Sequence, residues 1–294
     1  MNPDEIRTSN PDKVFYPESG LTKGDVVAHY RTVAAVMVPH LRGRPLTLRR
    51  YPHGIHGETW FQKEASSHFP DWLRVENVPQ RTSATVRHVI CDDAASLVYL
   101  ANQAVVEYHI WTSTMDALEQ PDMVVIDIDP PDDVDVRELR DIAKLIRQVY
   151  TAVGLTAYLQ ATGGRGFHVV APVEPTASYA VVRQVALKAS ELLVRVDPER
   201  LTVAQRRDKR GDRVFLDTNR NGYTQTFIAP YSLRARPAAG VATPLDWGEL
   251  GKAAPDGWTP DRIKRRLARK ADPWRDMAEH AASAEKALAQ LKQY

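Results

Sequence analysis

The chain has 294 residues, of which 43% are hydrophobic and 26% are charged, a composition typical of a globular protein with a sizeable core. Its 39 Lys and Arg residues against 37 Asp and Glu residues leave a net charge of +2, so overall charge alone does not indicate a nucleic-acid partner. Cys91 is the only cysteine, which excludes an internal disulfide and a zinc site of several cysteines. Because no apolar leader and no run of about 18 apolar residues is evident, we expect a cytoplasmic protein with no membrane association.

The first half of the chain predicts helices and short strands in alternation. Thr22 is a candidate N-cap with Asp25 three residues on, and apolar residues at helical spacing follow, as in a capping box. We expect this helix to end at Pro39. The other elements expected here are a helix opened by Asp92 or Asp93 that runs through residue 105, and strands over 46–51, 60–63, 84–90 and 106–110.

The stretch MVVIDIDP, residues 123–130, carries the strongest chemical signal in the chain. Its four leading apolar residues predict a strand buried on both faces. Since residues i and i+2 of a strand point to the same side, Asp127 and Asp129 should project together, with Cα atoms roughly 7 Å apart. Two carboxylates at this spacing can bind a pair of divalent cations, the usual apparatus for displacement at phosphorus. The alternative is two hydrated acids at a strand end without a metal.

The second half of the chain is more regular. Helices are expected from Asp135 to Gly154, over 178–196, from residue 259 and over 273–292, and strands over 155–160, 167–171, 214–216 and 225–228. No internal repeat or clear linker is evident, so we expect a single catalytic domain over residues 1–294. The pattern of elements indicates an α+β or α/β fold with a mixed central β-sheet flanked by helices.

A glycine-rich loop, TGGRGFH, lies between two of the expected strands, at residues 162–168. Glycines let backbone N–H groups approach phosphate oxygens, and Arg165 could add a charge-assisted contact. Thr162 and His168 could donate to a phosphate as well. The loop is not a Walker A sequence, because no Lys-Ser/Thr pair follows at the required offset. The alternative is a glycine hairpin with a surface arginine.

A third acid, Asp217, ends another apolar run in VFLDTNRN, and Arg220 follows it. Arg234 and Arg236 stand further downstream. An acid pair, a glycine–arginine–histidine loop and a later acid with trailing arginines form one coherent pattern for a triphosphate and metal ions.

Basic residues also gather locally, although the whole chain is nearly neutral. The clusters fall at residues 42–50, 206–213 and 262–270. Patches of this kind suit phosphate backbones, while each alone is more often a solvated helix face.

The ordered set DID, TGGRGFH and FLD resembles the three motifs of the archaeo-eukaryotic primase superfamily. More closely, the chain resembles the polymerase domain of bacterial DNA ligase D and its stand-alone relatives. The supporting stretches include NPDKVFYPESGLTKGD, LRGRPLTLRRYPHG, LVYLANQAVVEYHIW and IAPYSLRARP, and they extend from Asn10 to Trp247. The resemblance therefore covers most of the chain and implies a primase-polymerase core.

The family resemblance implies a template-directed nucleotidyltransferase that prefers ribonucleotides and acts at short gaps or double-strand break ends in DNA repair. Its implied cofactors are two Mn²⁺ or Mg²⁺ ions held by Asp127, Asp129 and Asp217. Its implied partners are nucleoside triphosphates, DNA with a 5′-phosphate at a gap or end, a DNA ligase and the Ku end-binding protein. A bacterial, nucleoid-associated location would follow.

The same resemblance assigns further residues to two binding roles. For the nucleotide, these are Thr162, Arg165, His168, Arg234, His109, Phe61, Arg50 and Arg220. For DNA, they are Asn10, Lys13, Lys23, Trp60 and Lys63. Trp60 stands where the family places a phenylalanine, which keeps an aromatic face and changes its shape. Thr162 replaces the more usual serine and Arg165 a common lysine, and both keep the hydrogen-bonding role.

Two other functions compete with a polymerase. One is a non-catalytic module that binds or bridges DNA ends, although a pure binder would not need three anionic residues facing phosphates. The other is a metal-dependent phosphodiesterase or nuclease, which also uses paired carboxylates. Nucleotide binding in the absence of DNA separates a polymerase from a nuclease.

Overall fold

A computed structural model describes residues 2–82 and 84–294. The chain divides into two compact units, each assembled from three stretches of sequence. Unit 1 comprises Met1–Asp116, Thr226–Thr243 and Trp258–Asp272, and unit 2 comprises Ala117–Gln225, Pro244–Gly257 and Pro273–Tyr294. Among the described residues, none of the helices combines the length and apolar character that crossing a bilayer requires.

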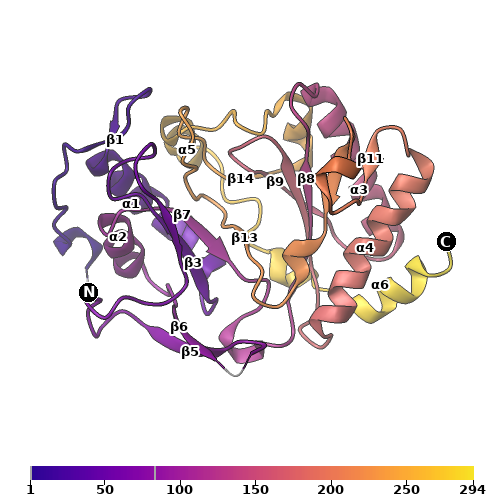
Figure 1. Ribbon diagram of the computed structural model, residues 1–294, viewed down its shortest axis with the longest axis horizontal. Coiled ribbons are helices and arrows are strands. Elements are labelled where there is room, and N and C mark those ends of the chain that lie inside the picture. Colours follow the sequence, from indigo (N-terminus) through magenta and orange to yellow (C-terminus); the bar gives the residue numbers. More distant parts are fainter. Residues whose placement is uncertain (1, 83) are drawn as a thin grey trace. The chain divides into compact units, whose positions relative to one another are not determined.

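Unit 1 is built on a four-stranded sheet with the order β13-β7-β3-β4 (Figure 1). Its strands are β13 (Phe227–Ile228), β7 (Val105–Ile110), β3 (Leu46–Arg50) and β4 (Trp60–Gln62). Two hairpins add β1 (Val14–Tyr16) with β2 (Leu21–Thr22), and β5 (Val75–Pro79) with β6 (Thr85–Val89). The helices are α1 (Lys23–Leu41), α2 (Ala94–Asn102) and α5 (Pro260–Leu267), and α1 packs on α2.

Helix α1 begins at the predicted N-cap. The Thr22 side chain accepts from the Asp25 backbone, and the Asp25 carboxylate accepts from the Thr22 backbone at 2.8 Å, which completes the capping box. The expectation that Pro39 ends the helix is wrong, because α1 continues to Leu41. Leu41 is fully buried and His40 lies 2.6 Å from Asp272, so these tertiary contacts hold the last turn past the proline.

Unit 2 contains a six-stranded sheet with the order β11-β12-β8-β10-β9-β14. Its strands are β11 (Leu201–Thr202), β12 (Val214–Asp217), β8 (Met123–Asp129), β10 (Phe167–Pro172), β9 (Tyr158–Ala161) and β14 (Thr243–Leu245). Helices α3 (Val136–Ala152) and α4 (Tyr179–Val196) pack side by side against β10 and β8, and α6 (Ala284–Leu291) packs on α4 (Figure 1). β11 pairs parallel to β12 while β12, β8, β10 and β9 pair antiparallel, so the predicted mixed sheet is confirmed.

Strand β8 lies at the centre of this sheet, as its sequence predicted. Val124, Val125, Ile126 and Ile128 have no exposed surface, and the two acids at its end are partly exposed. A run of apolar residues buried on both faces thus delivers Asp127 and Asp129 to an accessible edge of the core.

The single helix predicted over residues 273–292 is wrong. A short 3-10 helix covers Met277–His280 and α6 begins only after Ser283, whose side chain accepts from the Lys286 backbone. Between them, Ala282 forms a parallel bridge with Val173, and its carbonyl accepts from Glu174 at 3.0 Å. Pairing with the end of the sheet therefore outweighs helix propensity at this point.

Candidate active site

The acid pair on β8 meets the third acid through the register of the sheet. Asp127 pairs with Asp217 of β12 on one side and with His168 of β10 on the other. Cross-strand partners share a face of the sheet, so the three side chains converge. His168 Nε2 lies 3.3 Å from Asp127 Oδ1. Three segments separated by up to 90 positions thus form one polar site in unit 2.

Arginines balance the negative charge of these acids. Arg220 places Nε 3.4 Å from Asp127 and Nη2 3.3 Å from Asp217. Burial opposes the charge of Arg220, but the attraction of Asp127 and Asp217 outweighs it and raises the pKa of the guanidinium. Arg165 and Arg210 lie 3.7 Å and 3.6 Å from the Asp129 carboxylate.

Asp129 itself carries a raised pKa. Burial is the main cause and the charge of Asp127 the second, while Arg165 and Arg210 oppose the shift. A neighbouring carboxylate of the same charge raises the pKa of an acid, and a bound cation lowers that pKa again.

The glycine loop packs directly on β8. A Cβ at Gly166 would lie 1.8 Å from the Ile128 carbonyl oxygen, so only glycine permits this approach. Thr162 Oγ1 donates to the Gly166 carbonyl at 2.8 Å and accepts from the Gly164 N–H at 3.2 Å. Thr162 therefore fixes the shape of the loop, and the loop places Arg165 and His168 beside the acids.

A second polar group lies in unit 1, where β3 and β7 pair. Glu107 is almost fully buried. Its carboxylate lies 3.4 Å from Arg49 Nη1, 3.3 Å from His109 Nε2 and 3.2 Å from Arg234 Nε. Burial would raise the pKa of Glu107, but the hydrogen bond of His109 and the charge of Arg234 outweigh it and hold the pKa below its usual value. Glu107 thus acts as an anionic anchor that orients three cationic or titratable side chains.

The two aromatic residues of β4 point to opposite faces of this sheet. Phe61, 58% exposed, lies 5.0 Å from the Arg49 guanidinium and 5.7 Å from the His109 ring. Trp60, 40% exposed, lies 5.5 Å from Arg50. Arg50 donates instead to the Gln103 carbonyl at 2.9 Å. The arginine that lies with His109 and Phe61 is therefore Arg49, which was not among the site residues expected from the sequence.

The positions of Glu107 and Arg49 in the sequence carry some information about their place in the site. Glu107 stands two residues before His109 and therefore shares its face of β7, and Arg49 pairs with both Glu107 and Phe61 in the observed register. The register between β3 and β7 is not readable from either segment alone, because the two strands are far apart in the sequence.

The residues predicted to hold a 5′-phosphate also come together in unit 1. The Lys23 N–H donates to the Lys13 carbonyl at 2.8 Å, and Lys23 Nζ donates to Ser9 Oγ at 2.7 Å. Burial and then the charge of Lys13 lower the pKa of Lys23. Asn10 turns the chain here with φ +49°. Lys63 is exposed directly after β4.

Most of the predicted site residues thus form three groups, while Trp60, Arg50 and Lys63 lie outside these groups in unit 1. The acids, the glycine loop and Arg220 belong to unit 2, and the Glu107 cluster and the lysine pair belong to unit 1. Within residues 2–82 and 84–294, no set of three or more His, Cys, Asp or Glu side chains has the arrangement of a formed metal centre. The donor chemistry at Asp127, Asp129 and Asp217 nevertheless fits Mg²⁺ or Mn²⁺, which prefer carboxylate oxygens.

A family model for the LigD primase-polymerase domain matches residues 22–274, a range that includes segments of both units. The chain belongs to this family. Its structure matches the polymerase domain from Mycobacterium tuberculosis ligase D, solved in complex with DNA, with a TM-score of 0.87 and 30% identity over 94% of this chain and 99% of that chain. The predicted primase-polymerase fold is therefore confirmed, and the chain is a nucleotidyltransferase of a metal-dependent family.

Two curated relatives give the scale of the similarity. The multifunctional non-homologous end joining protein LigD of Mycolicibacterium smegmatis is 34% identical over 249 residues, 84% of this chain and 32% of the relative. The LigD protein of Mycobacterium tuberculosis strain H37Rv is 32% identical over 275 residues, 91% of this chain and 36% of the relative. The chain spans about a third of the length of these relatives.

Proposed function

We propose that this chain is a single catalytic domain that adds nucleotides, with a preference for ribonucleotides, to template-paired primer ends at DNA gaps and double-strand breaks. The observation that carries the proposal is the convergence of Asp127, Asp217 and His168 across three adjacent strands, beside the loop that presents Arg165. Acids for divalent ions next to donors for phosphate are the two requirements of nucleotidyl transfer.

In this proposal Asp127, Asp129 and Asp217 hold two Mn²⁺ or Mg²⁺ ions. When bound, such ions lower the pKa of an attacking hydroxyl and stabilise negative charge on the transferring phosphoryl group. Arg165 and His168 bind the triphosphate, and Thr162 holds the loop in the shape that presents them. Arg220 keeps Asp127 and Asp217 in place when they are not engaged with a cation.

In this proposal the residues of unit 1 bind the nucleotide and the DNA and take no direct part in phosphoryl transfer. Arg234, His109 and Arg49, anchored by Glu107, provide cationic and hydrogen-bonding contacts to the nucleotide, and the exposed ring of Phe61 offers a stacking surface. Arg50, beside Trp60, also contacts the nucleotide, and Trp60 and Lys63 contact the DNA strand. Asn10, Lys13 and Lys23 bind the 5′-phosphate of the downstream strand.

Non-homologous end joining is the proposed setting, because the relatives described above are named as non-homologous end joining proteins. Sealing would require a DNA ligase, and recruitment to ends would use an end-binding protein such as Ku. A cytoplasmic, nucleoid-associated location in a bacterium accords with this role.

The test is primer extension on a duplex with a one-nucleotide gap, with the four ribonucleotides or the four deoxyribonucleotides, each with Mn²⁺ or Mg²⁺. Template-directed gain of one nucleotide, faster with ribonucleotides, is the expected result. Shortening of the primer would indicate a nuclease instead. Binding of the gapped duplex without any change in primer length, under all four conditions, would indicate a non-catalytic end-binding module.

A further inference from the structure

Helix α5 carries an arginine stripe that the proposed active site does not use. Arg262, Arg265 and Arg266 stand at helical positions i, i+3 and i+4 and therefore share one face, and Arg269 follows in the turn after the helix ends at Leu267. Ile263 on the other side is fully buried in unit 1. The arginines line a hollow of about 610 Å³ together with Trp258 and Lys270.

This arrangement carries an electrostatic cost within the helix. Like charges three and four residues apart on a helix repel each other. Arg266 contacts the Trp258 ring at 5.0 Å, and the side chains of Arg262, Arg265 and Arg269 are exposed. A stripe of this density favours a polyanionic ligand over a small molecule, whose sites are mostly apolar.

The hollow is joined by backbone contacts to the segment that carries Arg234. The Val241 N–H donates to the Trp258 carbonyl at 2.7 Å, and the Arg234 N–H donates to the Gly240 carbonyl at 2.7 Å. Leu233 and Val241 pair as an antiparallel bridge. A short two-stranded segment thus links the arginine stripe to the Glu107 cluster within unit 1.

We propose that the α5 stripe binds the phosphate backbone of the DNA substrate, independently of sequence; this rests on the proposed polymerase function. Arg262 and Arg266 are four residues apart, which is about 6 Å along the helix axis, and Arg269 follows beyond the end of the helix. One strand of a duplex presents a phosphate about every 3.4 Å along its axis, so the helical part of the stripe faces about two phosphates. Arginine guanidinium groups suit such contacts, because they can bind phosphate oxygens through two N–H groups.

The test is the salt dependence of DNA binding by an Arg262→Ala/Arg265→Ala/Arg269→Ala variant, which leaves the Arg266–Trp258 contact in place. The plot of log affinity against log salt should become shallower by roughly 2–3, since each phosphate contact contributes about 0.9 to the slope. Affinity at low salt should fall roughly a hundredfold. The corresponding Arg→Lys triple should keep most of the slope, which also controls for folding.

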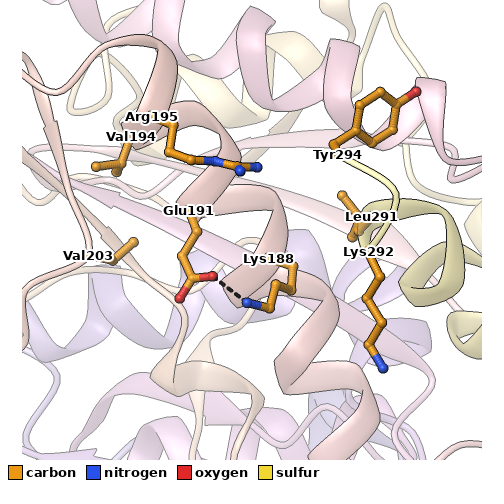
Figure 2. A pocket seen from close by; sticks show the side chains of 8 residues that line it. All are labelled: Lys188, Glu191, Val194, Arg195, Val203, Leu291, Lys292 and Tyr294. Atoms are coloured by element: carbon orange, nitrogen blue, oxygen red, sulfur yellow. Dashed lines mark hydrogen bonds and ion pairs between the residues drawn. The ribbon is translucent and has the colours of Figure 1, made fainter.

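A matched control removes three cations from another hollow. This hollow of about 470 Å³ in unit 2 is lined by residues of α4, by Val203, and by Leu291 of α6 with the residues that follow it. Lys188 pairs there with Glu191 at 2.8 Å (Figure 2). The Lys188→Ala/Arg195→Ala/Lys292→Ala variant loses the same charge and should bind DNA like the wild type. An equal loss in both triples would show that only net charge matters and would overturn the proposal.

An unchanged salt slope in the α5 triple would likewise overturn it and leave an acidic protein as the alternative occupant. Neither negative result touches the polymerase function, which gap extension by the wild type tests separately. Conversely, a wild type that binds DNA through α5 but never extends a primer would refute the polymerase function and keep the DNA-binding stripe.

Discussion

Asp217 at the end of β12 lies directly opposite Asp127 on β8, and one guanidinium, that of Arg220, bridges the two carboxylates. The two acids are 90 positions apart in the sequence, and the antiparallel register alone brings them together. Since cross-strand partners share a face, a slip of one residue would turn Asp217 away from Asp127. The site therefore depends on the buried apolar runs that fix this register as much as on the acids themselves.

Asp127→Ala or Asp129→Ala should each slow nucleotide addition about 10²- to 10⁴-fold, because losing a metal ligand forfeits several kcal/mol of charge stabilisation. DNA affinity, measured by fluorescence anisotropy, should stay close to that of the wild type. Asp141→Ala is the control, because Asp141 lies on the exposed face of α3, where it pairs with Lys144 at 2.9 Å. Extension at near wild-type rate by either active-site variant would falsify the assignment of the metal site.

Arg165→Ala and His168→Ala should weaken nucleotide binding roughly 10- to 100-fold, the range for one hydrogen bond to a charged group. Both residues are presented by the glycine loop beside Asp127 and Asp129. The measurement compares nucleotide affinity without DNA and DNA affinity without nucleotide. Arg137→Ala, at an exposed position on α3, serves as the control. If only DNA affinity falls, the loop grips the nucleic acid and the assignment is wrong.

Local signals in the sequence located the parts of the site that lie within one segment. The apolar run before Asp127, the glycine loop and the capping box at Thr22 each need only neighbouring residues to be recognised, and the structure has all three. The resemblance to a known family placed the remaining residues.

Features that depend on contacts between distant segments were missed. Arg49 and Glu107 meet through the register between β3 and β7, which neither segment shows by itself. The break before α6 has the same origin, because Ala282 pairs with Val173 more than 100 positions away. Such pairings are decided by the sheet as a whole, so periodicity within a single window cannot report them.

Gly166→Ala should impair both folding and nucleotide addition. A Cβ at this position would lie 1.8 Å from the Ile128 carbonyl oxygen, so the loop must move away from β8. Overpacking of this kind costs about 1–3 kcal/mol. Thermal unfolding and gap extension measure the two effects. Gly248→Ala is the matched control, since a Cβ at Gly248 meets no atom within 4 Å, and its stability should not fall. Wild-type activity of Gly166→Ala would show that the close approach is unimportant.

His29 should make the protein less stable as the pH falls from about 6.5 to about 4. Burial lowers the pKa of His29 to about 4, although the hydrogen bond to the Tyr231 carbonyl at 2.9 Å opposes the shift. Between the two values the unfolded chain binds a proton that the folded chain does not, so stability is full above the unfolded pKa and declines on acidification. The difference corresponds to about 3 kcal/mol.

The measurement is urea unfolding at several pH values for the wild type, His29→Gln and His68→Gln. A glutamine side chain does not titrate, so the His29→Gln variant should show a smaller loss of stability between about pH 6.5 and 4. His68 is exposed and its replacement should leave the wild-type decline intact. Parallel curves for the wild type and His29→Gln would assign the decline to other groups.

The last prediction concerns the lysine pair of unit 1, which should distinguish a 5′-phosphate from a 5′-hydroxyl. Lys23 begins α1 and is held beside Lys13 by the backbone hydrogen bond between them. The mutual repulsion that, after burial, lowers the Lys23 pKa would be relieved by a dianion, and the helix dipole at the start of α1 adds to the attraction.

Wild type should therefore bind a gapped duplex with a 5′-phosphate more tightly than the same duplex with a 5′-hydroxyl, by about 1–3 kcal/mol, the range for charge-assisted contacts. The Lys13→Ala/Lys23→Ala variant should bind both duplexes with the weaker affinity. Lys144→Ala/Lys286→Ala removes the same charge from exposed positions in unit 2 and should keep the discrimination. Titrations at moderate salt measure all six affinities, so that long-range attraction is screened. Equal affinity of the wild type for the two duplexes would show that the two lysines do not recognise the 5′-phosphate.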